Sequence, residues 1–259
     1  MPWTFSHPIA VVPLWRSASP RLNLAALVIG SLAPDFGYYA QAFDLATYAH
    51  TVPGTLLVCL PTGLLAWGIF QLVRRPLCYL LPQPHRAALW PLATPPNLRW
   101  RTLAGAALAI LVGTWTHTIW DSFTHASGWM VQHWLWLQMP LHVGIAVVPV
   151  SYVLQQVSTV GGAIGLAWLY WRWLQLQRIR HTERNGNGVR YCLLAGTAIF
   201  ALVIAAVWAW RAAALYEGFL AFRVWVFRTG VLTGALFVPL IIAVALIFSR
   251  RHQHVVHDP

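Results

Sequence analysis

The chain has 259 residues, of which 58% are hydrophobic and 9% are charged. Soluble domains average about 45–50% apolar and about 25% charged residues, so this composition speaks against a soluble globular fold. The 17 basic residues are all arginine and outnumber 6 acidic residues, and the 3 cysteines are too few and too scattered for a disulfide framework. Collagen and disordered chains are excluded as well, which leaves an integral membrane protein with three free thiols.

Five windows are apolar enough for membrane-spanning helices, which need about 20 predominantly apolar residues. They cover about 54–73, 103–123, 152–171, 191–210 and 230–248. A sixth window, about 22–43, has the length but carries Asp35 behind Pro34 at mid-depth, where a carboxylate costs about 2.5–3.5 kcal/mol. This window is either a span with a functional acid or a broken, re-entrant element. The sequence therefore predicts an all-α polytopic transmembrane helix bundle with about six spans.

The positions of the arginines predict which loops face the cytoplasm. Five lie in 74–102 and five in 172–190, whereas 124–151 holds none. The positive-inside rule places the first two stretches in the cytoplasm, and six spans then put both termini there. Because no phosphate-binding loop or zinc-finger spacing accompanies the charge, we expect the arginines to meet the headgroups of membrane lipid and no nucleic acid to bind.

The chain shows no internal repeat and no low-complexity linker, so residues 1–259 are predicted to form a single integral membrane domain. Its last two windows, within 191–248, carry almost no polar side chains and are typical of packing helices. Residues 1–165 hold the polar groups that could carry chemistry.

The segment HTIWDSFTH is the strongest candidate site, with His117, Asp121 and His125 at positions i, i+4 and i+8. On an α-helix this spacing puts the side chains along one stripe, rotated by about 40° per step. A pair at i, i+4 can chelate one ion, and Asp121 could bridge two ions about 3.5–4 Å apart. The ends of the set lie about 12 Å apart, too far for one ion unless the helix breaks. A proton relay and a structural hydrogen-bond network are the alternatives to a metal site.

Four further residues are candidates because ionisable groups at membrane depth are costly and indicate function by default. They are His7 in TFSHP, Asp35 in GSLAPDF, His50 in HTVPG and His142 in MPLHVG. In the six-span topology His7 precedes the first span and should lie on the cytoplasmic side, away from the other candidate residues. This conflict disappears only if the N-terminal segment dips into the bilayer. The histidines of the polar tail 252–259 are expected to be adventitious metal binders at most, because nothing orders them.

Several motifs carry a family resemblance. They are TFSHPIAVVPL at the start, LVIGSLAPDFGYY, HTVPGTLLVCLPTGLL followed by RRPL, the HTIWDSFTH segment and YVLQQVSTVGG. From residue 2 to about 165 they make the chain resemble an uncharacterised bacterial membrane family, the domain of unknown function 4184. This resemblance implies a multi-pass protein of the bacterial inner (cytoplasmic) membrane and no established activity.

The order of the candidate residues is also similar, more distantly, to the membrane-bound metal-dependent hydrolases and to zinc-dependent phospholipase C. That order is an N-terminal His, an Asp behind Pro, a His with Thr and Gly nearby, and H-x-x-x-D on a helix. The resemblance implies one or two zinc ions and seven metal ligands: His7, Asp35, His50, His117, Asp121, His125 and His142. The phospholipase pattern places a Glu four residues after its last His, where this chain has Ala146, so one ion of the full cluster lacks that ligand.

Two functions remain open at this point. The leading hypothesis is a membrane-embedded, metal-dependent hydrolase acting on a phosphoester or ester, with apolar surroundings that favour a lipid-derived substrate. The alternative is a non-catalytic membrane scaffold or a small transporter that uses Asp and His as an ion path. The apolar final windows speak against the transporter, because transporters commonly have related halves with interrupted helices in matching positions.

Overall fold

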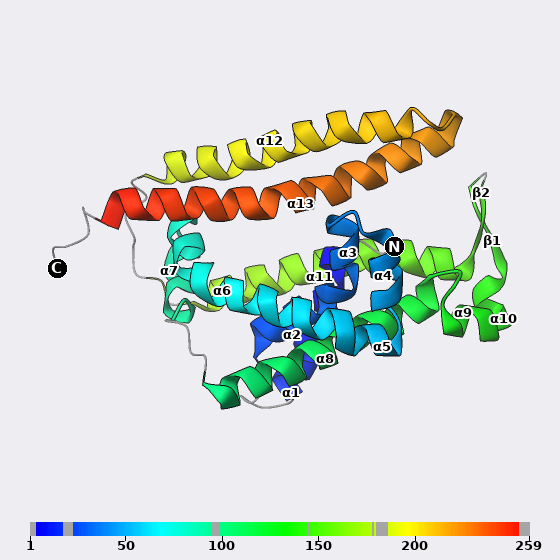
Figure 1. Cartoon of the computed structure of the whole chain (residues 1–259), viewed down its shortest axis with the longest axis horizontal. Coiled ribbons are helices and arrows are strands. Elements are labelled where there is room, and N and C mark those ends of the chain that lie inside the picture. The colour runs from blue at the N-terminus through cyan, green and yellow to red at the C-terminus, as the bar shows by residue number, and fades with distance from the viewer. Residues whose placement is uncertain are drawn as a thin grey trace. The chain divides into compact units, whose positions relative to one another are not determined.

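The computed structural model describes residues 4–17, 23–94, 99–144, 146–177, 179 and 186–253 (Figure 1). The tail residues His254 and His257 lie outside this part of the chain. Contacts within the chain define two compact units. Unit 1 comprises Met1–Gly37, Gln41–Ile69 and Asn97–Gln175, and unit 2 comprises Tyr38–Ala40, Phe70–Pro96 and Leu176–Pro259.

Short helices begin the chain. They are the 3-10 helix η1 (Thr4–Ala10), α1 (Val11–Ser17), α2 (Leu24–Leu32), the 3-10 turn η3 (Ala33–Asp35), α3 (Phe36–Tyr39) and α4 (Phe43–Ala49). A continuous helical stretch follows, built from α5 (Val52–Gly54), the π-helical turn η4 (Thr55–Cys59) and α6 (Leu60–Leu80). The connection to the next long helix contains α7 (His85–Leu89) and the 3-10 turn η5 (Trp90–Leu92).

The second half of the chain is dominated by four long helices. The elements are α8 (Trp100–Thr124), α9 (Trp129–His133), α10 (Leu135–Gln138), β1 (Pro140–Val143), β2 (Ala146–Pro149), α11 (Val150–Leu176), α12 (Asn187–Ala213) and α13 (Gly218–Gln253). The two strands pair antiparallel as a hairpin, with His142 opposite Val147. Helices otherwise account for the regular structure of the described residues, so the all-α prediction is confirmed.

Four helical stretches of the described chain are long and apolar enough to cross a membrane, where about six were predicted. They are Val52–Leu80, Trp100–His133, Asn187–Ala213 and Gly218–Arg251. The window 22–43 is not among them because it is broken at Ala33–Asp35, so the structure favours the broken element over the full span. The window 152–171 lies in α11, which has the length, but its glutamine, serine and threonine residues make it more polar than the four.

The core of unit 1 is formed where α2 packs closely against α8. Leu27 and Ile110 are fully buried there. The close approach depends on two glycines, because a Cβ at Gly30 would overlap the carbonyl of Ile110 and a Cβ at Gly113 would overlap the carbonyl of Leu27. This contact brings the backbone of α2 within hydrogen-bonding distance of side chains on α8.

Unit 2 is built around the antiparallel pair α12 and α13, which lie side by side in Figure 1. The buried side chains of α12 in its apolar stretch are alanines four residues apart: Ala201, Ala205, Ala209 and Ala213. The end of α6 packs on α13, where Leu80 contacts Ile241 and Ala245. Small residues at this spacing let two apolar helices approach closely, as expected for packing helices.

Candidate metal centre

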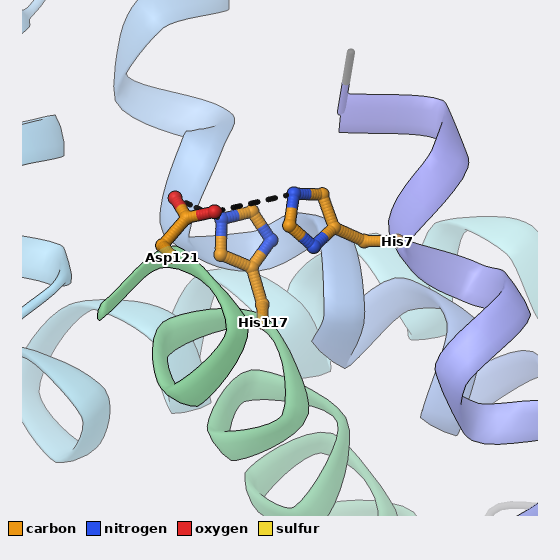
Figure 2. A group of neighbouring side chains, drawn as sticks. All are labelled: His7, His117 and Asp121. Atoms are coloured by element: carbon orange, nitrogen blue, oxygen red, sulfur yellow. Dashed lines mark ion pairs between the residues drawn. The ribbon is translucent and has the colours of Figure 1, made fainter. Parts of the chain in front are cut away.

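Two of the predicted ligands lie one turn apart on α8 and both are buried. The side chain of His117 is fully buried and that of Asp121 is nearly so. The His117 Nε2 atom lies 3.3 Å from Asp121 Oδ2. Figure 2 shows the His117 ring directed toward the Asp121 carboxylate, as the spacing of four residues predicts.

The orientation of His117 is set by the backbone of α2. Its Nδ1 lies 2.7 Å from the carbonyl oxygen of Ser31, and because a carbonyl only accepts, Nδ1 must donate. In the neutral ring Nε2 then carries the lone pair, and it is the Nε2 atom that faces the carboxylates. A backbone carbonyl in this position is the usual partner that fixes the tautomer of a metal-binding histidine.

Asp35 enters the same site from the break after α2. A 3-10 turn with Pro34 at its middle begins there at Ala33, and the Asp35 side chain at the end of this turn is fully buried. Its Oδ2 accepts a hydrogen bond of 2.6 Å from the hydroxyl of Thr4 in η1. Burial raises the pKa of the Asp35 carboxyl. A cation bound at the remaining oxygen, Oδ1, would favour the charged carboxylate and so lower this pKa again.

His50 follows the last residue of α4 and completes a ring of ligand-type atoms. Its Nδ1 donates to the carbonyl of Ala46 at 2.7 Å, so in the neutral ring its Nε2 carries the lone pair. That Nε2 lies 3.6 Å from Asp35 Oδ1 and 3.4 Å from Asp121 Oδ2. His117 Nε2 closes the ring, 3.7 Å from Asp35 Oδ1.

The lengths of these contacts separate a metal site from a hydrogen-bond network. Hydrogen bonds from nitrogen to oxygen are about 2.7–3.2 Å long, whereas the six His-to-carboxylate separations in the described cluster are 3.3–3.7 Å. Ligand atoms about 2.0–2.2 Å from a tetrahedral ion lie about 3.3–3.6 Å from one another. The spacing therefore fits an ion better than it fits direct hydrogen bonds.

Unsatisfied buried atoms point to the same conclusion. Four atoms of the cluster are buried and make no hydrogen bond: His7 Nε2, Asp35 Oδ1, His117 Nε2 and Asp121 Oδ1. Leaving such a group without a partner costs about 1–3 kcal/mol, and more for a charged group. All four are atoms of the kind that bind zinc, so one cation would satisfy several of them together.

His7 joins the cluster from η1, although it precedes the first long helix. Its ring stacks on that of His117 at 3.8 Å, and its Nε2 lies 3.5 Å from Asp121 Oδ1 (Figure 2). Burial, followed by the neighbouring His117, lowers the pKa of His7 to about 3, so the ring is neutral at pH 7 as a metal ligand must be. The N-terminal segment thus packs into the helices of unit 1, which resolves the conflict that the sequence raised.

His125 lies just beyond the end of α8 and contacts Asp121, its neighbour at i, i+4. α8 stops at Thr124 and His125 has extended backbone angles, so the continuous helix assumed for the separation of about 12 Å between His117 and His125 ends before His125. Its Nδ1 lies 3.5 Å from Asp121 Oδ2, and its Nε2 lies 3.3 Å from the side-chain nitrogen of Gln155 on α11. His50 and His125 are the partly exposed members of the cluster, with about a quarter of each side chain accessible.

His142 is the predicted ligand that the structure does not bring to this cluster. It lies on the exposed strand β1 and belongs to neither of the two groups of described residues that could hold an ion. Those groups are His7, His117 and Asp121, and Asp35, His50 and His117. Whether any of these seven residues binds metal stays a prediction.

Two polar residues near the cluster were missed by sequence reasoning. Thr4 was overlooked although it stands in the TFSHP motif, because a threonine in a sequence does not show which carboxylate it will meet. Gln155 carried a usable signal, since a buried glutamine in an apolar helix is costly unless it is paired.

Taken together, the helices and the buried histidines and carboxylates define an all-α membrane protein with a candidate metal centre. The sequence profile of a domain of unknown function, DUF4184, matches residues 1–245, and the chain belongs to this family. No curated protein and no solved structure matches the chain. The more distant similarity to metal-dependent hydrolases and phospholipase C therefore stays a prediction.

Proposed function

We propose that the chain is a membrane-embedded, metal-dependent hydrolase of phosphoester or ester bonds, with zinc as the ion. The observation that carries the proposal is the closed ring of Asp35 Oδ1, His50 Nε2, Asp121 Oδ2 and His117 Nε2, in which neighbouring atoms are 3.3–3.7 Å apart. Two imidazoles and two carboxylates form a donor set that suits zinc. A scaffold or an ion path would not require four ligand atoms held at this spacing.

The residues of the chain have distinct roles in this proposal. A bound zinc ion lowers the pKa of water toward about 7 and polarises an ester or phosphoryl oxygen. The carbonyls of Ser31 and Ala46 hold the two imidazoles in the ligating tautomer, and Thr4 holds the Asp35 carboxylate. The packing of α2 on α8 excludes water from the buried side, so exchange with the surroundings is expected on the side of His50 and His125.

Asp121 is placed to bridge two ions. Its Oδ2 is the ring atom beside His50 and His117, and its Oδ1 lies on the other side, beside His7. A second ion held by His7 Nε2 and Asp121 Oδ1 would keep positions for water and substrate, as catalytic zinc sites do. We therefore propose a first ion held by Asp35, His50 and His117, with Asp121 Oδ2 beside it, and a second, more open ion beside His7.

Metal analysis of the full chain purified in detergent tests this proposal. We expect one or two zinc ions per chain, and no bound ion in Asp35→Asn or Asp121→Asn variants. Asp44→Asn is the matched control, because Asp44 is an exposed aspartate on α4. His7→Ala should lower the zinc content and retain the tighter ion.

Activity forms the second half of the test. Hydrolysis of bis-p-nitrophenyl phosphate and of p-nitrophenyl esters should be lost on chelation, return with zinc, and be absent in Asp121→Asn. His133→Ala on the exposed part of α9 should behave as the wild type. Purified chain without a stoichiometric ion would overturn the metal site, and zinc-loaded chain without hydrolysis of either substrate would favour a non-catalytic metal protein.

We also propose that the chain resides in the cytoplasmic membrane of a bacterium as one domain, with residues 74–102 and 172–190 inside. Both termini are inside only if α11 and the broken segment 22–43 cross the membrane in addition to the four long apolar stretches. The arginines of 74–102 and 172–190 support this orientation. Reporter fusions near residues 90 and 180 should then report a cytoplasmic location, and a fusion near residue 135 an external one. A cytoplasmic signal near 135 would contradict this orientation, and an external signal from the N-terminus would show that the segment 22–43 does not cross the membrane.

A further inference from the structure

An apolar groove adjoins the candidate metal centre within unit 1. It has a volume of about 450 Å³ and lies between η1, α8 and α11, which is in the range of about 300–1,000 Å³ typical of small-molecule sites. Its lining includes His7, Trp120, Leu154, Val157, Gly161 and Gly162. His7 therefore belongs both to the wall of the groove and to the metal-binding cluster.

The groove is polar only at the His7 end. Two serines also line it, but their hydroxyls donate to backbone carbonyls: Ser6 to Thr159 at 2.7 Å, and Ser158 to Gln155 at 3.0 Å. No charged side chain is among the described lining residues. A ligand that fits this groove therefore has a long apolar part and one polar end.

The surroundings of the groove indicate what the apolar part is. Val157, Val160 and Ile164 on α11 and Ile119 on α8 are exposed, and α8 belongs to a stretch apolar enough to cross a membrane. Hydrocarbon is the solvent at that depth, so an open apolar groove there is filled by acyl chains rather than by water.

We propose that the groove holds an acyl chain of a membrane lipid, with the ester or phosphoester of that lipid at the His7 end. This inference rests on the proposed function, because it assigns the substrate class of the same site. Lipid enters the groove along the exposed face of α11, and its polar end meets the cluster beside His7 and Asp121.

Two neighbouring glycines on α11 provide a sharp test. A Cβ at Gly161 meets no atom within 4 Å, so Gly161→Leu should fill the groove without disturbing the fold. A Cβ at Gly162 would lie 2.9 Å from the carbonyl oxygen of Ser6, so Gly162→Ala should displace η1 and with it His7. Gly196→Leu, at an open glycine of α12 in unit 2, is the matched control.

The experiment is photolabelling of the full chain in vesicles that contain a phosphatidylcholine with a diazirine in its acyl chain. We expect labelling of peptides containing Leu154 and Val157, reduced about tenfold or more in Gly161→Leu, since a mismatch of one methylene between ligand and hydrophobic pocket already discriminates by about 10–200-fold. Labelling of exposed α12 residues such as Val203 should not change, and Gly196→Leu should label as the wild type. Unchanged labelling of the groove in Gly161→Leu would overturn the proposal.

Zinc content, measured on the same samples, separates this proposal from the proposed function. Gly161→Leu should keep its zinc, whereas Gly162→Ala should lose the ion beside His7. A chain that labels in the groove but binds no metal would retain the lipid site and refute the hydrolase. A chain that binds zinc but shows no labelling sensitive to residue 161 would retain the metal centre and refute the lipid site.

Discussion

The polar side chains at the start of α12 in unit 2 and those of the metal-binding cluster in unit 1 are buried in different ways. In unit 2, Asn187 exchanges hydrogen bonds with the backbone of Gln83, and Arg190 donates to the carbonyls of Tyr79 and Gly186 while its guanidinium contacts the rings of Tyr79 and Phe248. In unit 1, atoms of Asp35 and His117 are equally buried but make no hydrogen bond.

This contrast separates a structural use of buried polar groups from a functional one. Most buried polar groups that only stabilise a fold have partners within the chain, because an unsatisfied group costs about 1–3 kcal/mol. Ligand atoms of a metal site instead face one another at distances set by the missing ion. The cluster of unit 1 has this second pattern, and the network at the start of α12 has the first.

The largest expected effect comes from removing the shared ligand. His117→Ala leaves the Asp35 and Asp121 carboxylates buried without their common partner, which should lower the free energy of unfolding by about 3–5 kcal/mol and abolish zinc binding. Unfolding in detergent micelles and metal analysis measure the two effects. His133→Ala is the control, and a stable, zinc-loaded His117→Ala protein would show that the ring is not a metal site.

A smaller effect is expected from the threonine that supports Asp35. Thr4→Val keeps the shape of the side chain but removes its 2.6 Å hydrogen bond to Oδ2. Loss of such a supporting contact weakens metal affinity by about 10–100-fold. Competition with a zinc-binding dye measures the change, and unaltered zinc affinity would show that the Thr4 contact serves stability alone.

The corresponding change in unit 2 should affect stability without affecting the metal. Asn187→Ala leaves the backbone N–H of Gln83 without its buried partner, so the free energy of unfolding should fall by about 1–3 kcal/mol. Zinc content should stay at the wild-type value. Loss of zinc in this variant would show that the network at the start of α12 does not serve stability alone.

The smallest effect is expected at the end of the chain. Removing residues 252–259, which follow the last apolar window and include the last two residues of α13, should change neither the unfolding transition nor the zinc content, because polar chain ends tolerate truncation. A truncated chain that loses its ion would assign a binding role to the tail histidines.

Part of this protein followed from the sequence by itself. Long apolar windows predicted the helices, since a lipid-facing helix must be apolar along its whole length. The spacing of His117 and Asp121 predicted their shared face, because the α-helical repeat fixes it. The family resemblance was confirmed over residues 1–245.

Other features were decided by the tertiary structure alone. His7 reaches Asp121 only because η1 packs between elements that are distant in the chain, and no local pattern encodes such a contact. The place where α8 ends, one residue before His125, was also not evident from the sequence, because helix ends depend on packing as much as on sequence. The window 22–43 is not a continuous spanning helix, because it is broken at Asp35. Pro34 and the contact of Asp35 with Thr4 favour a buried turn there over a continuous helix.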